Sequence, residues 1–138
     1  MGLFDFLKKD KNNQQNRETV GIKLFYYDNN FDEGIKSNAA EETKQDIALN
    51  FFKELSKDSH SFIGFEDSIN KCIQFAWQEK DIWLVDIPNP PDFINFQQYA
   101  NEAECIAIIK TVYKTQKITK LPKMVKVKIM EETLEDVL

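Results

Sequence analysis

Short apolar-rich stretches separated by turn residues run along most of this chain, and they predict β-strands. In residues 19–27, every second side chain from Val20 to Tyr26 is apolar, which is the period of a strand with one buried face. Further strands are expected at residues 61–65, 69–77, 81–87 and 123–130. Residues 81–87 are apolar on both faces except at Asp86, and this favours a central place in the sheet.

Two other stretches have helical periodicity. One runs from Asn38 to about Ser56 and the other from Asn101 to about Thr115, each with an apolar stripe at a spacing of three or four residues. Both begin with Asn followed three residues later by Glu, which is the pattern of a capping box. The sequence therefore predicts two amphipathic helices, each packed by one face on the core.

Two segments lack either period. Residues 28–38 are rich in turn formers and predict a loop. In residues 88–99, Pro88, Pro90 and Pro91 have no backbone donor, so we expect an extended, partly exposed loop instead of a helix or a central strand.

The predicted order of elements is β-α-β-β-β-α-β. The links between the three middle strands are of hairpin length, so an antiparallel meander is expected. A single antiparallel sheet with two helices packed against it is the simplest way to bury these faces, which makes the fold class α+β. We assign residues 1–18 to an N-terminal turn and flexible linker, residues 19–130 to one domain, and residues 131–138 to an acidic tail.

The chain has 138 residues, which suits one domain with a core of its own. Its two cysteines, Cys72 and Cys105, make no disulfide framework and are expected to be reduced thiols of a cytoplasmic protein. No stretch is long and apolar enough to cross a bilayer. Membrane contact is expected only through residues 1–11, as a short amphipathic anchor with the apolar Leu3, Phe4, Phe6 and Leu7.

Charge is spread unevenly along the chain. Residues 28–109 hold sixteen acidic and six basic residues, a net charge of −10 that would suit a basic partner. Residues 110–128 hold seven Lys and no acid, and the acidic tail follows. These lysines suit a helix C-terminus and an edge strand. Because Arg17 is the only Arg, specific nucleic-acid recognition is not expected.

No motif carries recognisable chemistry, so we expect a non-enzymatic protein without a cofactor or a metal. Residues 28–39 match a calcium loop only in part, since Glu33 takes the place of the required Gly and Ala39 that of the bidentate Glu. His60 is the only histidine, and the two cysteines are far apart, which excludes zinc-ligand spacing. The four glycines form no phosphate-binding loop.

Two candidate sites remain. A protein partner would be contacted by Asp86, Phe93, Phe96 and Tyr99, since rigid aromatic side chains beside an acidic surface are typical interface anchors. Asp86 interrupts an apolar strand, so it either faces solvent or a partner, or is a buried carboxylate with a shifted pKa. Alternatively, a ligand-binding or enzymatic pocket lies between helices and sheet, lined by Tyr26, Trp77 and Trp83.

The stretch Cys72–Trp77, followed by Ile82–Pro88 and by a helix after the proline loop, resembles small bacterial immunity proteins of polymorphic-toxin systems. The resemblance covers residues 60–115. It implies a non-enzymatic protein that binds and blocks a toxin, and it assigns no functional residues. The leading hypothesis is therefore an immunity-type protein against a basic toxin, with a ligand pocket and a peripheral membrane adaptor as the alternatives.

Overall fold

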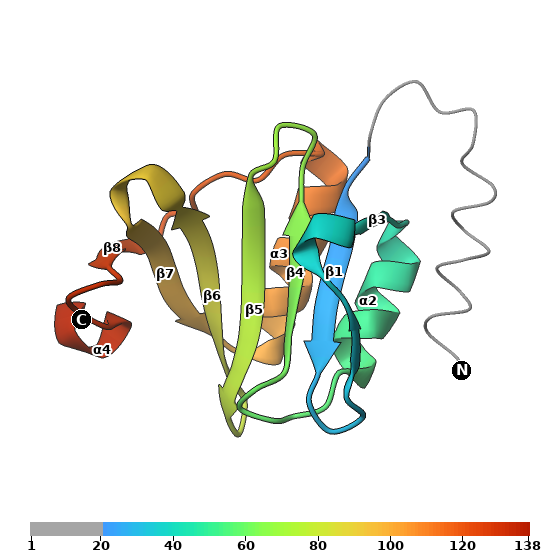
Figure 1. Cartoon of the computed structure of the whole chain (residues 1–138), viewed down its shortest axis with the longest axis horizontal. Coiled ribbons are helices and arrows are strands. Elements are labelled where there is room, and N and C mark those ends of the chain that lie inside the picture. The colour runs from blue at the N-terminus through green and yellow to red at the C-terminus, as the bar shows by residue number, and fades with distance from the viewer. Residues whose placement is uncertain (1–20) are drawn as a thin grey trace.

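The computed structural model describes residues 21–138, which form one antiparallel sheet of eight strands with helices (Figure 1). The strand order is β2-β1-β4-β5-β6-β7-β8, and the short β3 also pairs with β1. The strands are β1 (Lys23–Asp28), β2 (Glu33–Ile35), β3 (Glu41–Glu42), β4 (Phe62–Glu66), β5 (Cys72–Glu79), β6 (Ile82–Asn89), β7 (Ile94–Ala100) and β8 (Val125–Lys128). The α+β class and the single antiparallel sheet are confirmed.

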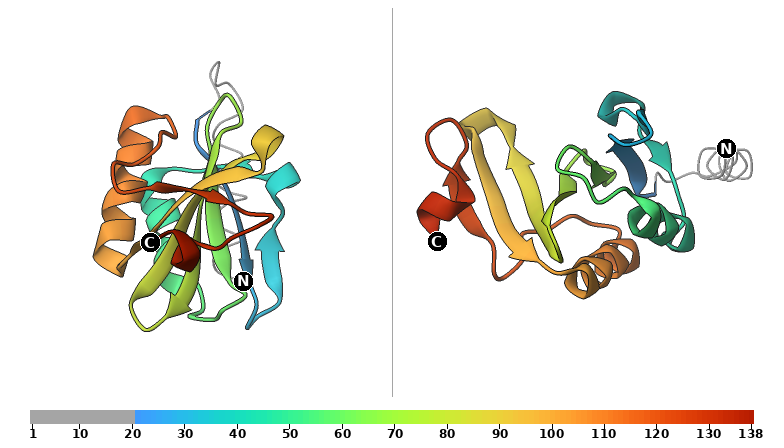
Figure 2. Two further views of the ribbon diagram at one scale, coloured as in Figure 1. Left: turned by 90° about the vertical axis from the view of Figure 1, so that its left-hand side faces the viewer. Right: turned by 90° about the horizontal axis from the view of Figure 1, so that it is seen from below.

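Two helices, α2 (Gln45–Glu54) and α3 (Glu102–Thr115), lie on the same face of the sheet (Figure 2). Phe51 and Phe52 of α2 and Ile109 of α3 are fully buried against it. The ring of Phe52 packs 4.6 Å from that of Trp83 on β6, at an interplanar angle of 42°. The core therefore lies between the sheet and these helices, while neither α2 nor α3 covers the opposite face of the central strands.

The strand predicted to be central, β6, lies between β5 and β7, and β8 is at the edge. The capping box at the start of α3 is confirmed, since Asn101 Oδ1 accepts from Glu104 N at 2.8 Å and Glu104 Oε1 accepts from Asn101 N at 2.9 Å. This motif forms from residues three positions apart, so the sequence shows it directly.

The predicted start of the first helix, at Asn38, was wrong. Asn38 lies in a 3-10 turn, η1 (Ser37–Ala39), and α2 begins only at Gln45. The intervening Glu41 and Glu42 form β3, which pairs with Leu24 and Lys23 of β1. Pairing with β1 satisfies backbone groups that a helix start at residue 38 would have satisfied within the helix.

The prediction of a loop at residues 88–99 was also wrong. β6 continues through Pro88 to Asn89, a 3-10 turn, η2 (Pro90–Asp92), forms the tip, and β7 returns from Ile94. β5 pairs with β6 only as far as Asp86, so Pro88 lies where that side of β6 has no neighbour. The prolines are thus confined to positions that need no ladder donor. Residues 94–100 pair with β6, and residues 94–97 also pair with β8.

The acidic tail ends in a short helix, α4 (Leu134–Val137). Leu134 is buried, and Thr133 and Asp136 form a second capping box. The predicted N-terminal linker and anchor lie outside the described residues. Within residues 21–138, none of the helices has the length and apolar character that crossing a bilayer requires.

Candidate functional site

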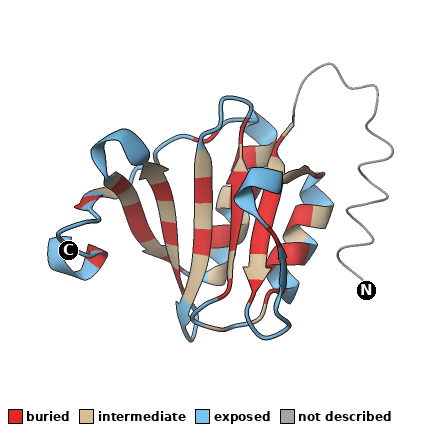
Figure 3. Cartoon of the chain, viewed as in Figure 1, coloured by how far each residue is buried: buried red, intermediate tan, exposed pale blue. Residues whose placement is uncertain are grey.

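The face of the sheet that the helices leave uncovered carries its own set of side chains. Buried and less buried residues alternate along β5 and β6, because successive side chains of a strand point to opposite faces of the sheet (Figure 3). On the uncovered face, the register aligns Gln74 of β5 with Asp86 of β6, and Asp86 with Gln97 of β7. A polar row therefore crosses three adjacent strands.

Asp86 is the centre of this row. Its Oδ1 accepts hydrogen bonds from Gln97 Nε2 at 2.7 Å and from Asn95 Nδ2 at 2.8 Å. Burial raises the pKa of the Asp86 carboxyl, and the two hydrogen bonds partly oppose that rise. Asp86 lies on the uncovered face and is half-buried. Its exposure is therefore intermediate between the two sequence-based alternatives, a solvent-facing and a buried carboxylate.

An aromatic cavity of about 530 Å³ lies on the same face, where β2 and η1 rise beside β1, β4 and β5. Phe25, Tyr27 and Phe62 form its aromatic walls, and Cys72 and Gln74 contribute from β5. The Tyr27 hydroxyl donates to Asp32 Oδ1 at 2.9 Å. Phe25 is only 3% exposed, although it points away from the helices. The uncovered face thus contains a cavity with aromatic walls, which we call the aromatic cavity.

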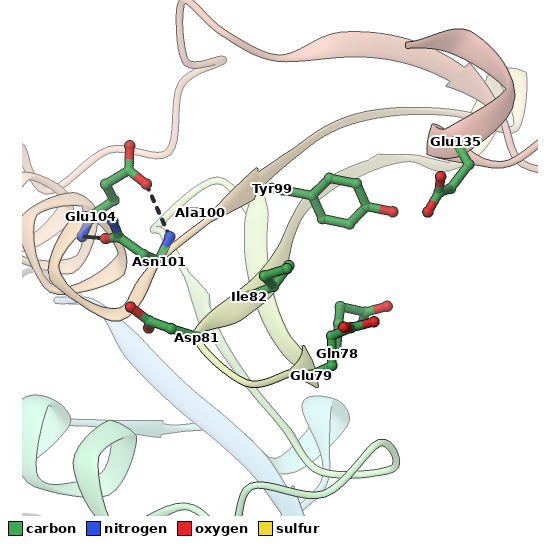
Figure 4. A pocket seen from close by; sticks show the side chains of 9 residues that line it. All are labelled: Gln78, Glu79, Asp81, Ile82, Tyr99, Ala100, Asn101, Glu104 and Glu135. Atoms are coloured by element: carbon green, nitrogen blue, oxygen red, sulfur yellow. Dashed lines mark hydrogen bonds between the residues drawn. The ribbon is translucent and has the colours of Figure 1, made fainter.

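A second recess, the acidic pocket, lies between the β5–β6 hairpin, the end of β7, the start of α3 and α4 (Figure 4). Its volume is about 380 Å³. It is lined by Gln78, Glu79, Asp81, Ile82, Tyr99, Ala100, Asn101, Glu104 and Glu135. Four of these side chains are carboxylates, and they come from three separate parts of the sequence.

Two of the four carboxylates have structural partners at the start of α3. Asp81 Oδ1 accepts from Glu102 N at 2.7 Å, and Glu104 contacts Lys123 at 3.3 Å in addition to its capping role. Glu79 and Glu135 are exposed, and neither has a cationic partner within residues 21–138. These two carboxylates therefore bring negative charge to the pocket that no cation of the described residues offsets, and Asp81, whose partner is a backbone N–H, adds a third.

Tyr99 lines the pocket together with Glu79 and Glu135, and Figure 4 shows its hydroxyl directed toward Glu135. Partial burial, followed by the negative charges of Glu135 and Glu79, raises the pKa of the Tyr99 hydroxyl. Tyr99 consequently stays a neutral hydrogen-bond donor. Of the predicted partner set, Tyr99 is the residue that lines the acidic pocket.

The predicted partner residues do not form one surface. Asp86 and Tyr99 lie on the uncovered face, whereas Phe96 pairs with Ile87 on the helix side, with Lys120 Nζ 5.8 Å from its ring. Phe93 lies at the hairpin tip, 58% exposed, with a left-handed φ of 52°. A backbone of this kind costs roughly 1 kcal/mol in a residue other than Gly.

The alternative pocket residues belong mainly to the core. Trp83 is fully buried, and Tyr26 is 4% exposed with its ring 5.0 Å from that of Phe51. Trp77 is half-buried, and its indole N–H donates to Lys80 O at 2.9 Å. Tyr26 nevertheless lines the aromatic cavity together with Phe25 and Tyr27 of the same strand, whereas Trp77 and Trp83 are not among its lining residues. Large side chains on both faces of residues 23–28 were the sequence signal for a second apolar surface.

The thiols have no features of catalytic nucleophiles. Burial, with the charges of Asp86, Glu66 and Asp67, raises the pKa of Cys72 to about 12. Burial also raises the pKa of Cys105, which is completely inaccessible. In the part of the chain that the structure describes, no three His, Cys, Asp or Glu side chains are grouped as metal ligands.

No family model matches this chain, and neither the curated proteins nor the solved structures contain a match.

Proposed function

We propose that this chain is a non-enzymatic protein-binding domain that takes up a basic segment of its partner in the acidic pocket. The observation that carries the proposal is the pair Glu79 and Glu135, two exposed carboxylates without a cationic partner among the described residues, which line one pocket with Tyr99. They are brought together by the fold from residues 56 positions apart in sequence.

The pocket has the chemistry that a Lys or Arg side chain requires. Ile82 is 39% exposed and, with the ring of Tyr99, offers an apolar surface for the aliphatic stem. The carboxylates at the rim would pair with the charged head. The excess of acid over base in residues 28–109 would attract such a partner before contact.

The finer form of the proposal is an immunity-type protein that neutralises a basic toxin in the cytoplasm of a bacterium. It is supported by the resemblance of residues 60–115 to immunity proteins and by the acidic pocket, which is formed largely within that range. Exposed Phe93, whose carbonyl accepts from Ile129 N at 3.2 Å, would add an apolar contact at the other end of β7.

The test is growth of cells that express the reading frame adjacent to this one, with and without this chain, together with co-purification of the two products. Toxicity relieved by the chain and a stable complex are expected. Absence of both toxicity and complex would overturn the immunity-type proposal.

The pocket itself is tested with Glu79→Gln/Glu135→Gln, which removes two charges while keeping side-chain size. We expect slower association and a smaller dependence of the association rate on salt. Glu54→Gln/Glu131→Gln removes the same charge from exposed positions outside the pocket and is the matched control. Equal losses in both variants would mean that overall charge, and not this pocket, attracts the partner.

A further inference from the structure

The aromatic cavity is separate from the acidic pocket, because the two share no lining residue. It opens on the uncovered face, between the strand β2 and the centre of the sheet. Its volume of about 530 Å³ falls in the range of small-molecule sites. Such sites combine apolar walls with a few fixed polar groups, and both are present here.

The aromatic walls are held in place from below and from the side. A Cβ placed on Gly64 would lie 2.1 Å from Phe25 Cζ, so the Phe25 ring lies directly over the backbone of β4 at a residue without a side chain. The rings of Phe25 and Phe62 meet edge to face, with centroids 6.4 Å apart. The hydrogen bond from Tyr27 to Asp32 fixes the third ring. These walls exist before a ligand arrives.

The polar groups around the cavity favour a positive charge. Asp32 and Glu33 line it, against one cation, Lys36. On the β5 side, the lining residue Gln74 lies directly opposite Asp86 in the sheet register. Both hydrogen bonds to Asp86 end on Oδ1, and Oδ2 makes none within residues 21–138. This carboxylate is therefore fixed in position through Oδ1, while Oδ2 is left without a hydrogen bond among the described residues.

We propose that the aromatic cavity binds a small organic cation with a flat apolar body. The body would lie against Phe25, Tyr27 and Phe62, whose ring faces attract a cation as well as an apolar group. The nitrogen-bearing end would point along Gln74 toward Oδ2 of Asp86. This inference does not depend on the proposed protein partner, because it uses other residues.

Benzamidine, benzamide and benzoate test it, because these three molecules share one shape and differ in charge. Full-length protein labelled with ¹⁵N-glycine gives at most four backbone glycine signals. Gly34 lines the cavity and Gly64 lies beneath Phe25, whereas Gly21 lies away from the cavity lining beside Glu42. We expect benzamidine to shift the Gly34 and Gly64 signals saturably in the millimolar range, with a much smaller shift for Gly21.

The preference of the cavity for a positively charged ligand is tested by comparing the three molecules and by the substitution Asp86→Asn. Benzoate should bind at least about threefold more weakly than benzamidine, and Asp86→Asn should reduce that difference, while Asp32 and Glu33 in the lining maintain the rest of it. Asp92→Asn removes a charge from the exposed tip of the β6–β7 hairpin and should leave the difference in affinity between benzamidine and benzoate unchanged. Phe62→Leu, at a half-buried position, should weaken all three molecules alike.

Three results would overturn the inference: no saturable shift with benzamidine, equal affinity for benzamidine and benzoate, or shifts centred on Gly21. Each variant is first checked for an unchanged glycine spectrum in the absence of ligand, so that a loss of binding is not mistaken for a loss of fold. Where Asp86→Asn alters that spectrum, the comparison of benzamidine with benzoate on the unsubstituted protein still decides the outcome.

Discussion

Gln97 donates a hydrogen bond of 2.7 Å to Asp86 directly across the ladder between β6 and β7. Asn95, two residues before Gln97 on β7, donates the second at 2.8 Å. Both amides are buried, at 9% and 8% exposure. The segment that the prolines suggested to be a loop is therefore the strand that holds the one carboxylate interrupting the apolar strand β6.

This arrangement predicts a stability that depends on pH at Asp86. Because the folded-state pKa of Asp86 is raised by burial, the folded protein binds more protons than the unfolded chain between the two pKa values. The contribution of Asp86 to stability is then lost as the pH rises through the folded pKa. We expect Asp86→Asn to gain stability relative to the unsubstituted protein as the pH rises above the ordinary pKa of an Asp carboxyl, measured by urea unfolding at a series of pH values.

The control for this measurement is Asp92→Asn, which removes a carboxylate from the exposed η2 turn. The gain should be specific to Asp86. A stability difference for Asp86→Asn that stays constant with pH, or one equally large for Asp92→Asn, would contradict the assignment.

Cys72 should react slowly in the folded protein. With a pKa of about 12, almost no thiolate forms near neutral pH, so alkylation by iodoacetamide should be roughly a thousandfold slower than for a free thiol. Peptide mass spectrometry distinguishes Cys72 from Cys105. Because Asp86 is the largest charge contribution after burial, Asp86→Asn should speed alkylation of Cys72 and leave Cys105 unchanged. Rapid labelling of Cys72 without unfolding would contradict this reading.

Gly64 should tolerate no side chain without cost. Ala at this position places a methyl group 2.1 Å from the buried Phe25 ring, which must move, and we expect a loss of about 1–3 kcal/mol in the free energy of unfolding. In a Phe25→Leu background the loss should be smaller, since the two residues are in contact. Gly21→Ala is the control, because its nearest neighbour is the flexible end of Glu42. Equal losses at both glycines would be evidence against a rigid Phe25 wall.

The capping box of α3 should be worth about 1 kcal/mol, so Asn101→Ala should lower the free energy of unfolding by that amount. Thermal or urea unfolding measures it. Asn50→Ala, at an exposed position inside α2, removes the same amide without a cap and should not destabilise the protein. A neutral Asn101→Ala would show that tertiary packing alone sets the start of α3.

Local pattern determined a large part of this fold. Short apolar-rich stretches predicted β1, β4, β5, β6 and β8, and helical spacing predicted the packed faces of α2 and α3. Residues 81–87, apolar on both faces, predicted the central position of β6. These features depend on neighbours a few residues apart, so they can be read from the chain alone.

Of the candidate site, the sequence showed Asp86 and Tyr99 as unusual residues but not what surrounds them. Asn95 and Gln97 are polar residues with no local signal, and they become partners of Asp86 only through the pairing of β7 with β6. Glu135 reaches Tyr99 only because buried Leu134 anchors α4. The aromatic cavity likewise depends on which face of β1 the helices cover.

The same capping pattern occurs twice in the sequence, at Asn38 with Glu41 and at Asn101 with Glu104. Only the second pair forms a capping box. Glu41 is paired instead with Leu24, and Thr43 N donates to Ile22 O at 3.1 Å, so the first segment extends along β1 before the helix begins. A local motif competes with long-range backbone hydrogen bonds for the same groups. The sequence alone determined that both caps were available, and only the tertiary structure decided which one formed, because the competing strand is distant along the chain.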